Sequence, residues 1–482
     1  MTRHTRIVAA ILGLPLWMAA GALHAGCGEL TGLAIEKAVV TSAELVPAGS
    51  RIALTGDSST APVKDEFCRI RVTSKPSADS DIRIELWVPS GAAWNGKFEQ
   101  IGNGGFAGSI PFEAMSRVLV RGYAVAGTDD GHQAADMTDG LWAMNHPEKI
   151  KDYGWRAIRD TTLVSKRLVS ELTARPPAKS YFVGCSDGGR EALMMAQRFP
   201  AFFDGIVAGA PFASAVRTLT GGAVRLIDGN GTVSLTGPQL EALQSHVLRT
   251  CGGKGGYLTD PRECHVDLNP LKCPAGGDAC LSAPQTDFVR SLYAEHRDPA
   301  SGAALYGYLP GAEAVKGSWE PWLTNAEGKP TLGAAFAWNY LAYMVRGDPK
   351  LKLDQVTTAE LARGERAFGP ILDSDGADLS AFKAHGGKLL QYHGWNDPAI
   401  PPGYSTEFAG RLAAKTPGTD QFYRLYMVPG MLHCGGGVAP TRVDWQAIIE
   451  NWVEKSSPPG ELIAADGQGA TQTLRAYQPS AR

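Results

Sequence analysis

A serine in a glycine-rich turn is the first candidate for chemistry in this sequence. Ser186 lies in the pattern G-x-S-x-G at 184–188, directly after a predicted strand and before a predicted helix at 190–199. A sharp turn from strand to helix needs glycines, because it leaves no room for side chains beside the serine and lifts the hydroxyl above the sheet. The alternative is a glycine-rich turn with an incidental serine, but the flanking strand and helix favour a nucleophile.

A serine hydroxyl is a weak nucleophile, so it needs a base that an acid orients. Asp397 follows a predicted strand at 388–394, and His433 lies in a glycine-rich loop after a predicted strand at 422–430. The chain order Ser, Asp, His is one in which this triad occurs. His393 is a competing base, but it lies in the last residues of its strand and would precede the acid. Together these residues predict hydrolysis of an ester or a peptide through an acyl-enzyme.

Backbone N–H groups that could stabilise an oxyanion are predicted at two places. One is Asp187 at the start of the helix, and the other is Gly104 or Gly105 in a glycine-rich stretch that follows a predicted strand. That stretch could instead be only a tight turn. We expect Asp130 and His132 to be structural, because the triad already has its acid and its base.

Strands and helices alternate along both ends of the chain. The predicted strands are 82–89, 98–103, 122–129, 180–184, 204–211, 388–394 and 422–430, and the predicted helices are 156–174, 190–199 and 442–455. The first strand alternates apolar and polar residues, which is typical of a half-buried antiparallel strand, and the others are apolar runs typical of strands buried on both faces. This order predicts an α/β fold with a mostly parallel sheet.

The alternation stops between about residues 215 and 375, which we interpret as an insertion. We therefore expect a catalytic domain formed by residues 26–214 and 376–482, with a second domain at 215–375 between them. The insertion carries four of the eight cysteines and a concentration of aromatic residues.

Composition excludes several classes of protein. The 482 residues include 46 Lys+Arg and 49 Asp+Glu, a net charge of -3, and 44% are hydrophobic, which is typical of a globular chain with a large core. Disorder and coiled coil are excluded. No basic run marks a nucleic-acid or anionic membrane partner, so we expect neither. The sequence does not indicate an oligomeric state.

Residues 1–25 have a basic start, an apolar run and a small final residue, Ala25, as in a secretory signal. The run is too short for a membrane span, and no later stretch reaches about 18 apolar residues, so we expect no transmembrane helix. A lipid anchor on Cys27 is the alternative, but His24 stands where an aliphatic residue is expected. We expect an exported protein, periplasmic or secreted.

Eight cysteines, an even number behind an export signal, predict disulfides. A zinc site is the competing interpretation, with ligands from Cys251, Cys264, His265, Cys273 and Cys280. No C-x-x-C pair occurs, however, and adjacent Cys and His residues suit a tetrahedral site poorly.

Two cysteines stand beside the predicted triad. Cys185 precedes Ser186 and Cys434 follows His433. A working triad would bring the two Cα atoms of this pair close to the roughly 4.4–6.8 Å that a disulfide needs. Such a bond would hold the base beside the nucleophile.

With these residues in place, the chain resembles the tannase/feruloyl esterase family of secreted serine esterases, which also includes bacterial hydrolases of mono(2-hydroxyethyl) terephthalate. The family pattern is matched by Cys185-Ser186, Asp397 and His433-Cys434, and further by GNGGFAG at 102–108, GTDDGH at 127–132, HGWNDP at 393–398 and PGMLHCGGG at 429–437. The resemblance implies an α/β-hydrolase core with a lid domain and an ester substrate with an aromatic acyl group. It also implies the disulfides Cys27–Cys68, Cys185–Cys434, Cys251–Cys264 and Cys273–Cys280.

One departure from the family concerns calcium. Family lids usually carry an Asp-rich calcium loop after the cysteine that matches Cys251, whereas residues 252–259 contain no carboxylate and only Asp260 follows. Calcium takes six to eight oxygens, several of them from carboxylates. We therefore predict no calcium at this loop and no other cofactor.

These observations predict an exported serine carboxylesterase for feruloyl, galloyl or terephthaloyl esters. A serine peptidase on the same fold and a non-catalytic binding protein are the alternatives. In the insertion, Trp319, Trp322, Phe336 and Trp338 are predicted to hold the acyl ring. Alternatively, these aromatics form only the core of the lid, since large aromatic side chains usually supply core area.

Overall fold

The protein is described here by a computed structural model that covers residues 26–55, 59–134, 136–228, 233–273, 278–324 and 330–479. The predicted signal at 1–25 lies outside the described residues. In these ranges, no helix is both long enough and apolar enough to cross a membrane.

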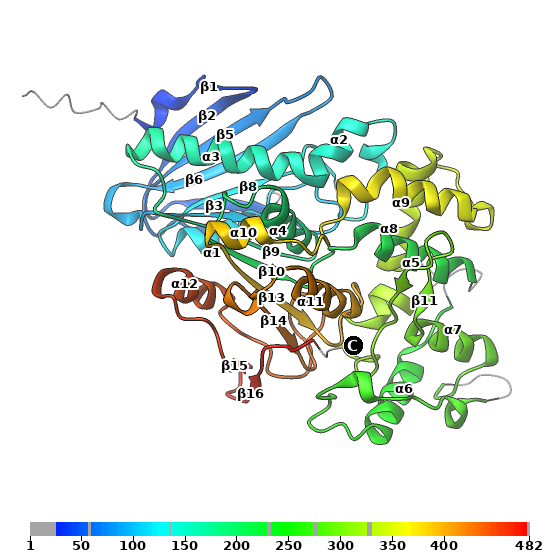
Figure 1. Ribbon diagram of the computed structural model, residues 1–482. Helices are drawn as coiled ribbons and strands as arrows, with labels where there is room; N and C mark the ends of the chain where they lie inside the picture. The colour runs from blue at the N-terminus through cyan, green and yellow to red at the C-terminus, as the bar shows by residue number, and fades with distance from the viewer. Residues whose placement is uncertain are drawn as a thin grey trace, which may run out of the picture.

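A ten-stranded sheet forms the centre of the molecule (Figure 1). In sheet order its strands are β1 (Ala34–Ile35), β2 (Ala38–Val46), β5 (Phe67–Ser74), β6 (Ile82–Pro89), β8 (Ala124–Thr128), β7 (Lys97–Ile101), β9 (Lys179–Cys185), β10 (Gly205–Gly209), β13 (Lys388–Gly394) and β14 (Tyr423–Val428). The strands from β8 to β14 are parallel, and β1, β2, β5 and β6 pair antiparallel at one side. The predicted α/β fold with a mostly parallel sheet is confirmed.

β6 pairs antiparallel with its neighbours, as predicted. The prediction that one face of this strand is exposed to water is wrong. Only Arg83 is exposed in this strand. On the face expected to meet water, Trp87 stacks on Phe112 at 6.0 Å, and the buried Glu85 accepts hydrogen bonds from Trp87 and Arg69. The polar residues of the alternation are therefore paired inside the fold.

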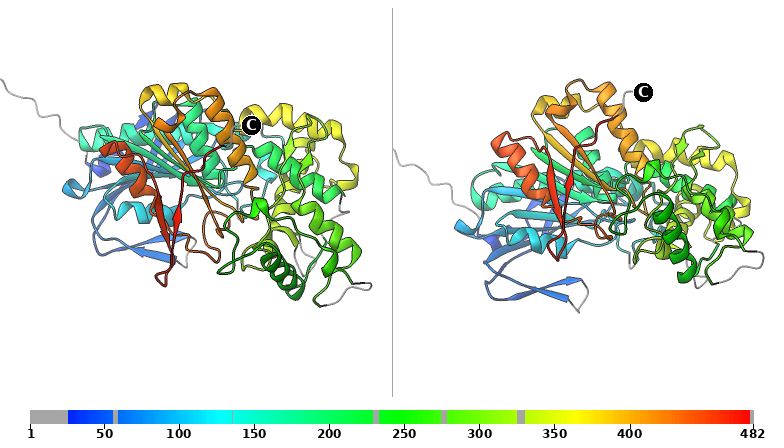
Figure 2. Two further views of the ribbon diagram at one scale, coloured as in Figure 1. Left: turned by 60° about the horizontal axis from the view of Figure 1, so that its bottom comes forward. Right: turned by 90° about the horizontal axis from the view of Figure 1, so that it is seen from below.

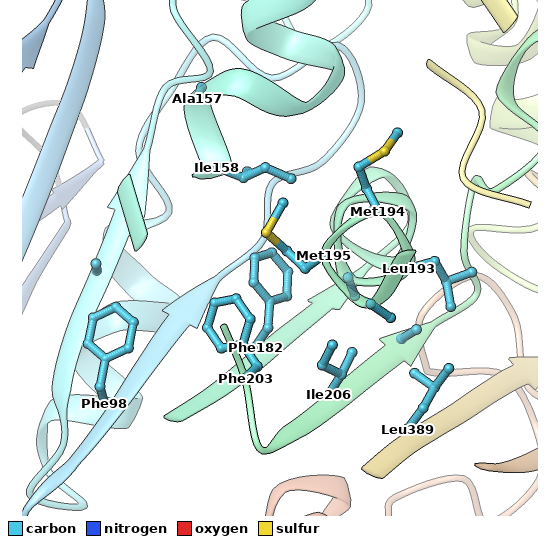
Figure 3. Packing of buried hydrophobic residues seen from close by; sticks show 14 of the residues in the cluster. Phe98, Ala157, Ile158, Phe182, Leu193, Met194, Met195, Phe203, Ile206 and Leu389 are labelled. Carbon is cyan, nitrogen blue, oxygen red and sulfur yellow. The ribbon is translucent and has the colours of Figure 1, made fainter. Parts of the chain in front are cut away.

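Helices cover both faces of the sheet. One face packs against α3 (Ala157–Thr173), α4 (Asp187–Arg198), α10 (Ser380–His385) and α11 (Gly403–Lys415), and the other against α1 (Phe112–Leu119) and α12 (Trp445–Lys455). Figure 3 shows Leu193 and Met195 of α4 above Phe182, Ile206 and Leu389 of the strands. All five side chains are fully buried, so α4 is held firmly on the sheet.

The helix predicted at 190–199 begins earlier, at Asp187. Its first turn contains Gly188 and Gly189, which weaken the helical pattern in the sequence. Small antiparallel hairpins complete this part of the fold, namely β3 (Arg51–Thr55) with β4 (Ser59–Pro62) and β15 (Leu462–Ala465) with β16 (Thr471–Leu474).

Between β10 and β13 the chain leaves the sheet. It forms α5 (Ala215–Asp228), α6 (Gly237–Thr250), α7 (Ala283–Tyr293), the hairpin of β11 (His296–Arg297) and β12 (Ala304–Leu305), α8 (Leu332–Asn339) and α9 (Thr358–Leu372). Figures 1 and 2 show this segment, coloured green to yellow, beside the sheet.

The segment at 215–375, which we call the insert, has two apolar clusters. One is its own and includes Leu243, Phe288 and Trp319. The other is shared with the described residues outside the insert, which form the ten-stranded sheet and which we call the sheet domain. In this cluster Leu219 and Tyr340 of the insert lie with Phe106 and Tyr153. The insert is thus packed against the loops that follow β7 and β8.

Candidate active site

Ser186 stands at the turn between β9 and α4. Its backbone angles are φ 64° and ψ -121°, and its N–H donates to Gly209 O at 3.0 Å. A Cβ on Gly188 would lie 2.8 Å from Asn103 O, so this position needs glycine. The turn has the geometry that the sequence pattern predicts for a nucleophile elbow.

Asp397 follows β13 and is buried, with all its oxygens engaged. Its Oδ1 accepts the N–H groups of Ala399 at 2.8 Å and Ile400 at 2.9 Å. Its Oδ2 accepts His433 Nδ1–H at 2.7 Å and His393 Nε2–H at 3.1 Å. Burial alone would raise the pKa of Asp397, but the two histidines outweigh it and hold the pKa well below the ordinary value. This carboxylate is therefore ionised.

His433 follows β14 and is bound to the acid. Because Nδ1 is bound to Asp397, Nε2 is the nitrogen left for proton transfer. His433 and Ser186 line the same cavity, and their neighbours Cys434 and Cys185 form a disulfide with a Cα–Cα distance of 5.9 Å. The three residues predicted from the sequence are thus brought together.

His393, the competing base, has a different place. It is fully buried, its Nδ1 accepts the Ser405 hydroxyl at 2.7 Å, and it is not part of the cavity lining. Its Nε2 side reaches Asp397 and Ile400 O. His393 is therefore a second hydrogen-bond partner of Asp397 and lies outside the cavity that Ser186 lines. Its position in the sequence did not reveal this role.

The cavity above Ser186 has a volume of about 270 Å³. Its apolar lining comprises Phe106, Met137, Phe212, Leu219, Trp322, Phe336, Ala337, Ala399 and Ile400. Phe212 and Leu219 were not predicted, because single apolar residues beside a strand end or on a helix look like ordinary core positions in a sequence.

Of the four predicted aromatics of the insert, the structure places two in this lining. Trp322 and Phe336 face the cavity and stack on each other at 6.3 Å, and Trp322 meets the ring of His433 at 5.5 Å. The other two lie outside the lining. Trp319 is buried against Tyr293, and Trp338 Nε1 donates to Leu351 O at 3.1 Å.

The predicted oxyanion donors also meet at this cavity. Gly104, Gly105 and Asp187 all line it, and their N–H groups have no acceptor in the described parts of the chain. Gly105 has φ +59°, and a Cβ there would lie 2.5 Å from Met137 O. Glycine is therefore required for the course of this loop.

Asp130 and His132 are buried outside the cavity lining. His132 Nε2–H donates to Phe106 O at 2.7 Å, and its ring stacks on Trp142 at 3.9 Å. Burial lowers the pKa of His132 to about 4, so the ring is neutral. Both residues thus lie outside the cavity lining, and the structural role expected for them stays a prediction.

Four disulfides are formed, Cys27–Cys68, Cys185–Cys434, Cys251–Cys264 and Cys273–Cys280. They are the four pairs that the family resemblance implies. The zinc interpretation is wrong for these residues, because a sulfur bonded in a disulfide is not a thiolate ligand.

The loop after Cys251 does not fit a calcium ion. Asp260 Oδ1 accepts Arg262 Nε–H at 2.8 Å, and Arg262 Nη2 lies 2.5 Å from Oδ2. Residues 252–259 bring a lysine and no carboxylate. A site of several hard anionic oxygens cannot be built from these groups.

Comparisons with known proteins agree with this geometry. The family model described as tannase and feruloyl esterase matches residues 68–479. An uncharacterized esterase of Xanthomonas campestris is 35% identical over 92% of this chain and 84% of its own length. A probable feruloyl esterase B-2 of Aspergillus terreus is 31% identical over 90% of this chain and 86% of its own length.

Solved structures extend the likeness to the fold. Feruloyl esterase B from Aspergillus oryzae superimposes with a TM-score of 0.81 at 26% identity, covering 92% of this chain and 93% of that chain. A tannin acyl hydrolase from Aspergillus niger superimposes with a TM-score of 0.73 at 21% identity, covering 92% and 89% of the two chains. The protein is therefore a carboxylic ester hydrolase with an α/β-hydrolase fold, and it belongs to the tannase and feruloyl esterase family.

Proposed function

We propose that this protein is an exported serine esterase for esters of neutral aromatic acids, with Ser186, His433 and Asp397 as its catalytic triad. One observation carries the proposal: Ser186 and His433 line the same cavity while His433 Nδ1–H is held at 2.7 Å by a buried, ionised carboxylate. In this arrangement His433 Nε2 can take a proton from the serine, and Asp397 stabilises the imidazolium that results.

The reaction follows from these positions. Ser186 Oγ attacks the ester carbonyl carbon while its proton passes to His433 Nε2, and the carbonyl electron pair moves to the oxygen. The N–H of Asp187 and that of Gly104 or Gly105 stabilise this oxyanion. The bond to the leaving oxygen then breaks, and His433 returns the proton so that the alcohol departs. Water repeats the two steps on the acyl-enzyme and releases the acid.

The cavity favours a neutral acyl group. Its lining in the described residues contains no Lys or Arg. A terephthaloyl monoester would bring a carboxylate into this largely apolar space without a cation, which costs several kcal/mol.

A galloyl ring is also a poor match, because it would bring three hydroxyls that need partners. Besides Ser186, only Thr218 and Tyr308 add side-chain hydroxyls to the described lining, and Thr218 already donates to Ser214 O at 2.9 Å. A feruloyl-type acyl group, with one hydroxyl on a flat apolar ring, suits these walls best.

Export and the lid belong to the proposal as well. The signal pattern at 1–25 and four disulfides support an oxidising compartment. We propose that residues 215–375 form a lid domain on a catalytic domain of 26–214 and 376–482, because the insert supplies Trp322 and Phe336 to the cavity over Ser186.

Rates on methyl ferulate, methyl gallate, a terephthalate monoester and a peptide of similar size test the function. We expect kcat/KM to be highest for the ferulate and lowest for the anionic monoester and the peptide. A fluorophosphonate probe should label Ser186 and should not label the Ser186→Ala variant. Preference for the anionic monoester would contradict the neutral acyl group, faster cleavage of the peptide would favour a peptidase, and absence of labelling would favour a non-catalytic protein.

A further inference from the structure

We propose that Glu191, a residue outside the triad, is a positioning residue for the oxyanion hole. It holds the loop that carries Gly104 and Gly105 against the start of α4, where the Asp187 N–H lies. This inference rests on the proposed function, since it concerns how the N–H donors of that reaction are aimed.

Glu191 lies in α4, one turn after the serine, and is fully buried. Its Oε2 accepts the N–H of Asn103 at 2.9 Å. On the other side of the same residue, Asn103 O accepts the N–H of Gly188 at 2.8 Å. Asn103 is therefore bound to α4 through both of its backbone groups.

The peptide geometry connects these bonds to the oxyanion. The carbonyl of Asn103 and the N–H of Gly104 belong to one planar trans peptide, so they point in opposite directions. Fixing Asn103 O on Gly188 therefore aims the Gly104 N–H away from α4, and Gly104 lines the cavity. Gly188 is itself the neighbour of Asp187, the other proposed donor. One helix start thus sets the direction of both donors.

Tyr153 and Arg190 form a second set of hydrogen bonds between this loop and the start of α4. The Tyr153 hydroxyl donates to Asp187 Oδ1 at 2.8 Å and lies 3.2 Å from Gly105 O. Arg190 is fully buried and binds the Asp187 carboxylate through Nε at 2.5 Å. Loss of Glu191 should therefore loosen the loop without releasing it.

Two neighbouring carboxylates, those of Asp130 and Asp187, affect the charge of Glu191. One carboxylate oxygen each from Asp130, Asp187 and Glu191 lies within 4.8 Å of the others. Burial and then the charge of Glu191 raise the pKa of Asp130 well above its ordinary value, so Asp130 is the acid that keeps its proton. Burial and the charge of Asp187 raise the pKa of Glu191 to about 7.

Three carboxylates could also hold a cation, but Asp187 is already engaged by Arg190 and Tyr153. Glu191 is bound to protonated Asp130, and it accepts a backbone hydrogen bond from Asn103, in the loop that carries Gly104 and Gly105. We therefore assign the cluster to holding that loop.

The test compares Glu191→Gln with Glu191→Met. Gln keeps an oxygen that can accept the Asn103 N–H, whereas Met keeps the length of the side chain and has no such acceptor. We expect Met to lower kcat on methyl ferulate on the order of 10- to 100-fold, below the loss seen when an oxyanion donor is removed outright. KM should change less than about threefold, because the ground-state carbonyl depends little on these donors. Gln should recover most of the kcat.

Two further measurements separate positioning from stability. Affinity for an aryl boronic acid, which forms a tetrahedral adduct on the serine, should fall in Glu191→Met in proportion to kcat, while affinity for ferulate itself should not. Glu99→Ala is the matched control, because Glu99 is another buried glutamate, lies on β7 and is not part of the cavity lining. It should leave kcat unchanged, whatever its effect on Tm.

The inference is overturned if Glu191→Met retains the wild-type kcat, if Gln fails to recover it, or if the loss appears in KM alone. Should Glu191→Met not fold, Glu191→Asp replaces it, because the shorter side chain withdraws the carboxylate from Asn103 and the same outcomes apply. Failure of the proposed function is a different result: Ser186→Ala would then keep its activity, whatever the Glu191 variants do.

Discussion

The sheet domain and the insert meet at one cavity, but the predicted reacting groups come from the sheet domain alone. Ser186, His433, Asp187 and the loop with Gly104 and Gly105 come from strand ends of the sheet, and each is fixed by backbone hydrogen bonds, a disulfide or a buried carboxylate. The insert adds no such groups and supplies apolar walls such as Trp322 and Phe336, beside apolar walls from the sheet side such as Phe106 and Phe212. We therefore expect the reaction to depend on positions set by the sheet, and the choice of acyl group to depend on apolar side chains from both regions.

The largest effect is expected from the sheet side. Ser186→Ala should lower kcat by about four orders of magnitude or more. Without the serine hydroxyl no acyl-enzyme can form, so the base and the oxyanion donors have no such step to accelerate. Tm should stay within about 2 °C of wild type, since the change removes one hydroxyl. Esterase assays and thermal unfolding check this. Activity above a few per cent would contradict the assignment of Ser186.

Two disulfides, one from each region, give the next contrast. Cys185–Cys434 closes a loop of 249 residues and Cys251–Cys264 closes one of 13. In the chain-entropy model they contribute about 5 and about 3 kcal/mol to stability. Replacing the first pair by Ala should also lower kcat on the order of 10- to 100-fold, because His433 loses its tie to the serine side.

Replacing Cys251 and Cys264 by Ala is the control, and it should lower Tm without changing kcat. An equal loss of kcat in both double variants would mean that the bond beside the triad has no special part in catalysis. A thiol count on the denatured wild-type protein should find none.

Substitutions in the insert should change the selectivity for the acyl group. Trp322→Ala and Phe336→Ala should each lower the ratio of kcat/KM for a feruloyl over an acetyl ester by about 2- to 12-fold, which corresponds to stacking worth about 0.5–1.5 kcal/mol. Trp319→Ala and Trp338→Ala are matched controls from the same segment, outside the cavity lining. They should lower Tm and leave the ratio unchanged. If all four variants keep the ratio, the aromatics of the insert do not select the acyl group.

The same contrast separates what the sequence could predict from what it could not. The strand ends carrying Ser186, Asp397 and His433 were predictable, because apolar runs, glycines and the order of the triad are local patterns. Trp322 and Trp319 could not be told apart, since which one faces the cavity depends on contacts between α8, the preceding loop and the sheet domain. Glu191 was missed because a charge in a predicted helix looks solvent-exposed until its burial is known.

A pH experiment compares one buried glutamate from each region. Burial raises the pKa of Glu99 on β7 from 4.5 to about 8, and its Oε2 has no hydrogen-bond partner among the described residues. Glu313 in the insert is also buried and its pKa is raised, but Tyr293 and Gly311 donate hydrogen bonds to it at 2.6 and 2.8 Å.

For Glu99 the sign follows from linkage. Below about pH 4.5 the folded and unfolded states are both protonated, and stability is full; above it the unfolded chain loses its proton first, so stability falls as pH rises through about 8. Glu99→Gln should remove this slope, and its Tm should exceed that of the wild type increasingly between pH 6 and 9. Glu313→Gln should follow the wild type more closely. If the Tm values of Glu99→Gln and wild type changed with pH in parallel, Glu99 would not be protonated in the folded protein.

The smallest expected effect is that of a chelator on the insert. Family lids with a calcium loop would lose stability on removal of the ion, but here Asp260 is paired with Arg262 and residues 252–259 bring no carboxylate. EDTA should therefore leave Tm and kcat unchanged, and added calcium should not raise Tm.

Asp260→Asn tests whether this carboxylate pairs with Arg262 and binds no calcium. The variant should have a slightly lower Tm with or without calcium, because it loses the ion pair with Arg262. A drop of several degrees on adding EDTA, reversed by calcium, would show that oxygen ligands from another part of the chain bind the ion. The insert would then need a metal for its own stability, whereas the sheet domain would depend only on its core and its disulfides.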